Sequence, residues 1–349
     1  MKFATINGRN AFFIIGFLLL LALAWAIGFD VILDNVRKTG WWFVAIIGMW
    51  LPIYAINTWS LNLIIRDNNP QNRAVPFMQI LKVNISGFAL KAATPLGFIG
   101  GDPYKIIEFK RFFGVEKATS SVVLYTMTHI SAQFIFWALS IVVAELFVPK
   151  AAAWNLTLLI SFICFILVLY LLWRGYKHGM TVAFFGVMSK IPYIKRKLLP
   201  FCQSHKDRFV QIDEQISHLY HHRRKVFIQS LLLEFVARVL NCIEVYIILR
   251  SAHMDITLVQ SIVVYSFMSL FTNILFFSPM QLATREGGFV LAISALGLPG
   301  SMGIYVSLVT RVRELVWIGT GVLLMKVLPS YMPRKLKECS CDPSNQSDQ

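Results

Sequence analysis

Two short stretches of the chain combine helix-breaking residues with charged ones. The first, PLGFIGGDPYK, runs from Pro95 to Lys105. Asp102 directly before Pro103 is typical of a helix N-cap followed by the first helical position, and the glycines beside them permit a tight turn. The start of a helix also presents free N–H groups and a positive dipole to an anion, so a cap and an anion site both stay open as interpretations. The basic residues that follow are Lys105, Lys110 and Arg111.

The second stretch, PMQLATREGGF, runs from Pro279 to Phe289. Thr284 is a candidate N-cap, with Glu286 in the first turn of the helix that it would begin. That arrangement accounts for Glu286 structurally but leaves Arg285 unexplained. We therefore treat this stretch as a second candidate for binding a charged group.

Charged residues also lie inside long apolar runs. Glu234 and Arg238 are four residues apart and Arg311 and Glu314 are three apart, so each pair shares a helix face, with Arg313 turned elsewhere. A lone charge at the centre of a bilayer costs about 2.5–3.5 kcal/mol on insertion scales, so these residues need partners or water. They either form ion pairs that join helices or line a polar cavity that handles a charged substrate.

A histidine and an amide lie one helical turn apart in another apolar run. At the spacing of His129 and Gln133 we expect hydrogen bonds inside a helix bundle rather than catalysis. The cluster formed by His218, His221 and His222 lacks the Cys or carboxylate ligands that would complete a metal site. We expect no metal and no cofactor.

The composition indicates which elements must position these residues. Hydrophobic residues make up 56% of the 349 and charged residues 15%, against roughly 25% charged in soluble domains. Crossing about 30 Å of hydrocarbon takes about 20 apolar residues in a helix, and several runs are that long. The sequence predicts an all-α bundle of about seven or eight spans. The clean predicted spans are Phe12–Phe29, Trp41–Ile65, Ser120–Val148, Trp154–Trp173, Val226–Leu249, Leu258–Phe277 and Gly303–Leu328.

Two apolar segments are not clean spans, and each borders one of the charged stretches. Phe77–Ile99 carries charges and ends in Pro and Gly, and Gln281–Leu298 is short and rich in Gly. Irregular backbone at membrane depth survives only inside protein or beside a wet cavity, so we predict one or two re-entrant or broken helices here. A basic amphipathic helix is predicted to follow the first of them, as far as about Phe113.

The net charge of +15 is concentrated in the loops. Residues 174–225 hold eleven Lys and Arg against three Asp and Glu, which predicts a cytoplasmic loop with a helix on the membrane surface. We expect a single integral-membrane domain over residues 1–333, a disordered polar tail over 334–349, a cytoplasmic N-terminus and no binding of nucleic acid. The sequence contains no nucleotide-binding loop and no hydrolase motif.

At the two charged stretches the sequence resembles the flippase-like family of lysylphosphatidylglycerol synthase transmembrane regions. The resemblance rests on Pro95 through Gly100, Gly101 and Asp102 to Lys105, on Glu286 in its Gly-rich segment and on Arg311 in the final span. The order of spans and the central basic loop agree as well. Lys105 stands where the family has Arg, and Leu282 and Ala283 replace glycines. There is no counterpart of the soluble aminoacyl-transfer domain, so the resemblance implies a transporter rather than a synthase.

The resemblance implies that the chain moves a lipid with a polar headgroup between the leaflets of the cell membrane. The lipid would be an anionic or aminoacylated phospholipid or a polyprenyl phosphate. Lys105, Arg285 and Arg311 would hold the phosphate, with Glu234 and Glu286 balancing charge or meeting a cationic headgroup. The full set of candidate substrate-binding residues is Gly100, Gly101, Asp102, Lys105, Arg111, Glu234, Arg238, Arg285, Glu286, Arg311 and Glu314.

Two other classes of protein stay open. One is an integral-membrane enzyme of envelope lipid or glycolipid biosynthesis, for which His129 and Glu286 would be the catalytic candidates. The other is an accessory subunit that binds a partner of envelope biosynthesis. A homo-oligomer is a further open alternative.

Overall fold

The computed structural model describes residues 37–66, 75–94, 101–147, 161–171, 173–174, 223–275, 281 and 283–327, together with Trp25, Asp30 and Leu33. Within these ranges every regular element is a helix, as predicted. The first predicted span, most of the basic loop, the tail and Gly100 lie outside the described residues. The labelled helices are α3 (Trp42–Gly48), α4 (Trp50–Ile65), α5 (Phe77–Ala93), α6 (Gly101–Phe113), α7 (Val115–Phe147), α12 (Arg224–Ser251), α13 (Leu258–Ile274), α14 (Thr284–Ala295) and α15 (Ser301–Val327).

Two helical segments of the described chain are long and apolar enough to cross a membrane. Trp42–Ile65, which joins α3 and α4, has a mean hydropathy of 1.4, and Val115–Phe147 has a mean hydropathy of 1.9. The 33 residues of α7 extend about 50 Å at 1.5 Å per residue, which exceeds the thickness of the hydrocarbon core. α12 and α15 have 28 and 27 residues but carry the charges noted above.

In the two segments that we predicted to be broken, the observed helices are shorter than the apolar runs of the sequence. α5 ends at Ala93, where Thr94 adopts an extended conformation, and α14 is only 12 residues long. Two predicted caps are wrong. α6 begins at Gly101, so Asp102 lies inside its first turn rather than at the N-cap. The N-cap of α14 is Ala283, whose φ is positive at 65°. Thr284 is the first residue of the helix, and its hydroxyl donates a hydrogen bond to the carbonyl oxygen of Gln281.

Eight of the described helices form two units with the same pattern, to which α3 and the helix Ser161–Leu171 do not belong. In the first, α4 is followed by a 17-residue helix, a 13-residue helix and the long α7; in the second, α12 is followed by a 17-residue helix, a 12-residue helix and the long α15. Equivalent helices pack together within each unit: α5 on α6 and α13 on α14, then α6 on α7 and α14 on α15. The two charged stretches of the sequence thus occupy equivalent places in a repeated architecture.

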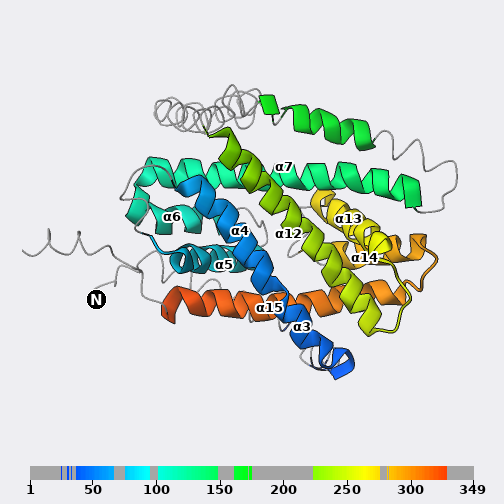
Figure 1. The fold of residues 1–349 in the computed structure, drawn as a ribbon. Coiled ribbons are helices and arrows are strands. Elements are labelled where there is room, and N and C mark those ends of the chain that lie inside the picture. Colours follow the sequence, from blue (N-terminus) through cyan, green and yellow to red (C-terminus); the bar gives the residue numbers. More distant parts are fainter. Residues whose placement is uncertain are drawn as a thin grey trace, which may run out of the picture.

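The two units run in opposite directions and interlock. In Figure 1, α7 and α15 lie on opposite sides of the two units and run opposite ways, and α4 and α12 cross the front, also in opposite directions. A half-turn about the line of sight therefore exchanges the two patterns. α5 packs against α15 and α13 packs against α7, so the second helix of each unit contacts the long fourth helix of the other. The axis of this half-turn is perpendicular to α7, which has the length of a membrane span. An axis perpendicular to the spans is the symmetry of inverted-topology repeats.

Close backbone approaches hold the short helices in place. A Cβ on Gly101 would lie 2.6 Å from the carbonyl oxygen of Gly87, so α5 and α6 can approach this closely only because Gly101 lacks a side chain. A Cβ on Gly303 would lie 2.5 Å from the backbone of Val290, so α15 approaches α14 equally closely. Small residues of this kind allow close helix packing where the hydrophobic effect contributes little.

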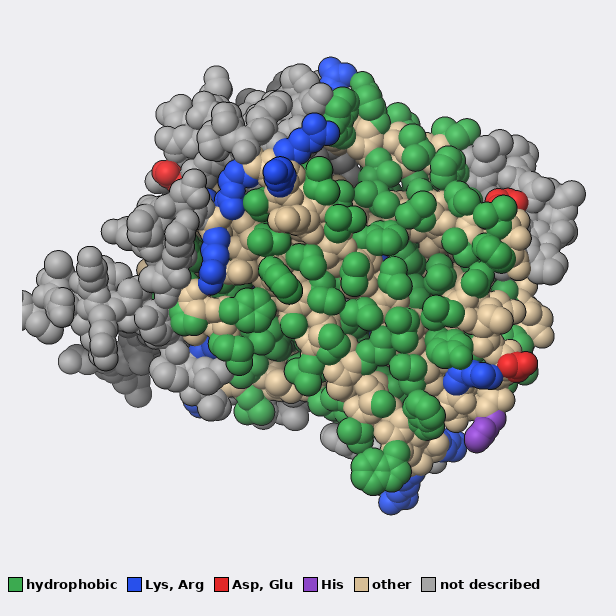
Figure 2. All heavy atoms as spheres, in the orientation of Figure 1, with side chains coloured by type: hydrophobic (Ala, Val, Ile, Leu, Met, Phe, Trp, Pro, Cys, Tyr) green, Lys and Arg blue, Asp and Glu red, His purple; other side chains and the backbone are tan. Residues whose placement is uncertain are grey.

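The outer surface is largely apolar. Figure 2 shows a face covered by hydrophobic side chains, with most Lys and Arg at its rims. Exposed side chains on this and other surfaces include Trp59, Leu146 and Leu323, each more than half accessible. Polar side chains, by contrast, are found inside, among them Asn84, Glu234 and Arg313. This distribution is the reverse of that in a soluble bundle and suits a hydrocarbon environment.

Candidate functional site

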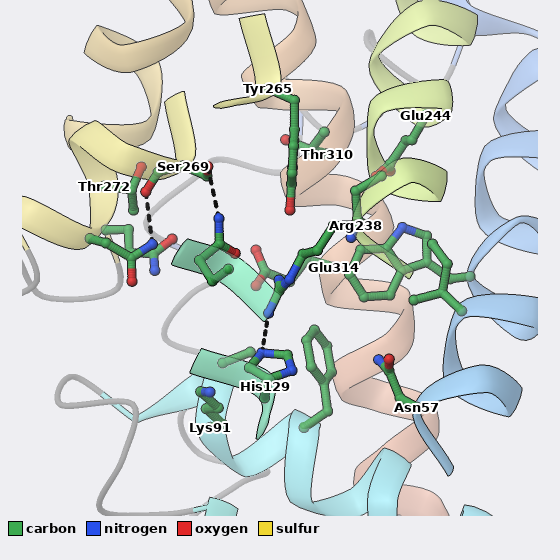
Figure 3. A pocket seen from close by; sticks show the side chains of 18 of the residues that line it. Asn57, Lys91, His129, Arg238, Glu244, Tyr265, Ser269, Thr272, Thr310 and Glu314 are labelled. Atoms are coloured by element: carbon green, nitrogen blue, oxygen red, sulfur yellow. Dashed lines mark hydrogen bonds between the residues drawn. The ribbon is translucent and has the colours of Figure 1, made fainter. Parts of the chain in front are cut away.

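A central cavity of about 330 Å³ lies where the two four-helix units meet. Every helix of both units contributes to its lining, and Figure 3 shows its polar side chains converging from several of them. Its volume falls at the lower end of the range for small-molecule sites. Five basic and three acidic side chains line it, an excess of two positive charges. They are Lys91, Lys105, Arg238, Arg285 and Arg313, with Asp102, Glu244 and Glu314.

The arginines of α14 and α15 are neutralised in two tight ion pairs. Arg285 Nη1 lies 2.6 Å from Glu314, and Arg313 Nε lies 2.9 Å from Glu244. The guanidinium of Arg313 also lies 3.9 Å from the ring centroid of Trp50, a cation–π contact. This part of the lining, which we call the paired end, therefore carries little net charge.

The histidine on α7 links two charged residues of α12. His129 Nδ1 lies 2.7 Å from the carboxylate of Glu234, which is fully buried, and a guanidinium N–H of Arg238 contacts His129 Nε2. Figure 3 shows Arg238 directed at the imidazole. The Nε of Arg238 is buried and has no hydrogen-bond partner among the residues that the structure describes. Within the same residues, Arg238 faces the cavity without a carboxylate of its own.

Two lysines lie close to this linkage. Lys91 is exposed at the cavity and makes no ion pair within the described part of the chain. It is near enough to Asp102 to interact with that carboxylate, and near enough to Lys105, Arg238 and Glu234 to interact with their charges as well. Lys105 is 3.7 Å from Asp102 and 4.9 Å from the ring centroid of Tyr125. We call Lys91, Lys105 and Arg238 the basic end of the cavity. Three cations there face a single lining carboxylate, so this end attracts anions.

The structure brings together five of the predicted site residues and separates the others. Asp102, Lys105, Arg238, Arg285 and Glu314 line the cavity. Glu234 lies behind His129, outside the lining. Gly101 serves the packing of α5 on α6, and Arg111 is 41% exposed beside Glu108. Those two predicted roles in binding find no geometric support.

The charges of the final span form ion pairs that join helices, one of the two alternatives that the sequence left open. Glu314 bonds to Arg285 and Arg311 bonds to Glu286 at 2.6 Å, so α15 is joined to α14 twice and its own Arg and Glu take different partners. Both partners lie on α14 because the side chains of α15 project toward that neighbour. Arg313, which we expected to turn elsewhere, lines the cavity.

Sequence reasoning left four lining residues with chemistry of their own out of the candidate set, and one of them is Lys91 of the basic end. Glu244 and Arg313 form one of the two pairs, and Tyr265 faces the cavity from α13. Glu244 could have been found, because it follows Arg238 and Asn241 at a spacing of three residues on the same face of α12. His129 and Gln133 do form hydrogen bonds inside the bundle, to Glu234 and Ser269, as expected.

The fold and the site define a helical bundle whose interior holds a charged cavity and whose surface is apolar. The chain matches the family of the lysylphosphatidylglycerol synthase TM region over residues 12–322, and it belongs to that family. It is a membrane protein of a lipid-related family. No curated protein and no solved structure matches the chain.

Proposed function

We propose that this protein moves a lipid with an anionic headgroup between membrane leaflets, with the headgroup passing through the central cavity. The observation that carries the proposal is the basic end, where Lys91 and Arg238 face the cavity without a carboxylate in ion-pair contact among the described residues. Charge-assisted hydrogen bonds from such groups replace the water that a phosphate loses on entering a bilayer. The ligand would be an anionic or aminoacylated phospholipid or a polyprenyl phosphate.

The size of the cavity supports a headgroup site. A volume of about 330 Å³ holds a small polar group rather than a whole lipid, so the tails would stay in hydrocarbon. The paired end would contribute to binding if the headgroup carries an amino group. Glu244 and Glu314 could meet an amino group on the headgroup, although each would have to share its oxygens with an arginine.

The inverted units supply a route for movement. In transporters built from inverted repeats, binding sites lie where the repeats meet, and rocking of one unit against the other exposes the site to each side in turn. The cavity lies at such a junction, between helices that follow the same order in both units. We place the protein in the cell membrane as a multi-pass chain of seven or eight spans with its N-terminus in the cytoplasm.

A leaflet-translocation assay tests the proposal. The full chain is reconstituted into liposomes with fluorescent phosphatidylglycerol, phosphatidylcholine or a polyprenyl phosphate, and dithionite quenching reports arrival in the outer leaflet. We expect faster movement of the anionic lipids than of phosphatidylcholine. A hydrogen bond to a charged group contributes about 1.5–3 kcal/mol, so Arg238→Gln should slow transport at limiting lipid by about tenfold or more.

Arg250→Gln is the matched control, because Arg250 lies on the same helix and pairs with exposed Asp255 away from the cavity. It should transport at the wild-type rate. No acceleration of any anionic phospholipid or polyprenyl phosphate by the wild-type chain would refute the proposal. An enzyme acting on these lipids would instead convert them chemically, which thin-layer chromatography of the same liposomes would reveal.

A further inference from the structure

The hydrogen bonds of His129 specify its protonation. A guanidinium can only donate, so the Nε2 that Arg238 contacts must accept, and the single ring proton is on Nδ1, which donates it to Glu234. The imidazole in the ligand-free protein is therefore neutral. Its remaining basic lone pair is covered by Arg238.

An anionic headgroup would compete for the same guanidinium. A phosphodiester offers charged oxygens in a geometry that arginine binds with two parallel hydrogen bonds, whereas the neutral imidazole offers one lone pair. The buried Nε of Arg238 also makes no hydrogen bond within the described ranges, so turning to a phosphate would satisfy an unmet donor. Binding of the headgroup would thereby uncover His129 Nε2.

The charges around His129 determine whether its ring can hold a second proton. Without a ligand, the cations of the basic end oppose a proton on the imidazole. With a phosphate in place, their charge is offset, and an imidazolium could donate from Nδ1 to Glu234 and from Nε2 to the phosphate. The charged groups that interact with His129 are Glu234 and Arg238 on α12 and Lys91 on α5, and the Tyr125 ring lies beside it on α7. The other helices packed around it present Asp102 and Lys105 (α6), Tyr265 (α13), and Tyr54 and uncharged Asn57 (α4) to the same cavity.

We propose that His129 binds one proton each time an anionic headgroup enters the cavity, so that lipid movement is coupled to proton movement. This inference rests on the proposed function. A hydronium ion in the cavity gives its proton to the lone pair of Nε2, forming an N–H bond and leaving water. When the headgroup departs, Arg238 returns to Nε2 and the proton passes back to water.

Calorimetry of the full chain in detergent measures the coupling directly. Short-chain phosphatidylglycerol is the probe, because its phosphodiester stays singly charged from about pH 5 to 9 and takes up no proton itself. Titrations near pH 7 in buffers of different ionisation enthalpy give the number of protons bound per lipid. We expect about one proton for the wild type, because a histidine can change its charge in this pH range.

His129→Gln is the decisive variant. A glutamine amide can donate to Glu234 and accept from Arg238, so it keeps both hydrogen bonds but cannot take up a proton. We expect it to bind the probe with an uptake near zero. His253→Asn is the control, because His253 lies in an exposed turn with a positive φ that Asn tolerates, and it should retain the wild-type uptake.

The outcomes separate this inference from the proposed function. Binding of phosphatidylglycerol by the wild type without proton uptake overturns the coupling but leaves transport intact, and that measurement needs no variant. Uptake that persists in His129→Gln overturns the assignment to His129. Failure of the wild type both to bind the probe and to accelerate leaflet exchange overturns the proposed function and the coupling with it.

Discussion

Removal of one partner from the buried pair of Glu244 and Arg313 should strongly destabilise the protein. Their side chains are 4% and 6% exposed and lie 2.9 Å apart, and the guanidinium packs on Trp50. Breaking a buried ion pair from one side costs about 3–5 kcal/mol, because the remaining charge is left without compensation. Glu244→Ala should therefore lower the free energy of unfolding by that amount.

The exposed pair of Arg250 and Asp255 gives the contrast. Its atoms lie 3.0 Å apart, almost the same distance, but the side chains are 48% and 101% exposed. Exposed pairs contribute about 0–1 kcal/mol, so Asp255→Ala should change stability by no more than that. The two variants thus separate burial from distance as the source of the effect.

Unfolding in mixed micelles, followed by tryptophan fluorescence as denaturing detergent is added, measures these free energies. The double variant Glu244→Ala with Arg313→Met is the sharpest test, since it removes the stranded charge and should recover most of the lost stability. Losses within about 1 kcal/mol of each other for Glu244→Ala and Asp255→Ala would refute the reasoning. So would a double variant that is no more stable than Glu244→Ala alone.

Three further predictions concern packing and charge at the same cavity. Gly101→Val should destabilise the fold by roughly 1–3 kcal/mol or more in the same unfolding measurement, because its side chain would overlap the backbone of α5. Gly287→Ala should be tolerated, because its Cβ would lie 3.6 Å from the nearest atom, on the ring of Phe271. Trp50→Leu should cost about 1–2 kcal/mol through loss of the cation–π contact, read from the same curves. Lys91→Gln should slow leaflet exchange of phosphatidylglycerol about tenfold at limiting lipid, while the exposed Lys110→Gln should leave the rate unchanged.

Much of the architecture is readable in the residues themselves. The long apolar runs predict α4, α7, α12, α13 and α15 close to their observed bounds, because a helix in lipid must be apolar over its whole length. The Gly and Pro residues after Ala93 and before Thr284 mark where α5 ends and α14 begins. Local sequence also identifies Asp102, Lys105, Arg238, Arg285 and Glu314 as charged residues that must find polar surroundings.

The partners of those charges could not be read in the same way. Spacing along one helix placed Arg311 and Glu314 on a shared face without naming their partners, and each bonds to a residue of α14, Arg311 to Glu286 and Glu314 to Arg285. Helical spacing tells which side chains share a face, but only the packing of helices determines which neighbour that face meets. For the same reason Glu244 and Arg313 were not recognised as a pair.

The repeated architecture was also invisible in the order of residues. The two units resemble one another in the lengths and contacts of their helices. The charged stretches at equivalent places both contain Pro, a Gly-Gly pair and one charge of each sign, but in a different order. His129 shows the same division. Its sequence position alone predicted a hydrogen bond inside the bundle, and the tertiary structure placed it between Glu234 and Arg238. Composition and local pattern determine that a charge must be buried with partners, because an unpaired charge in lipid is costly. The choice of partner depends on long-range packing, because only that packing brings helices distant in sequence into contact.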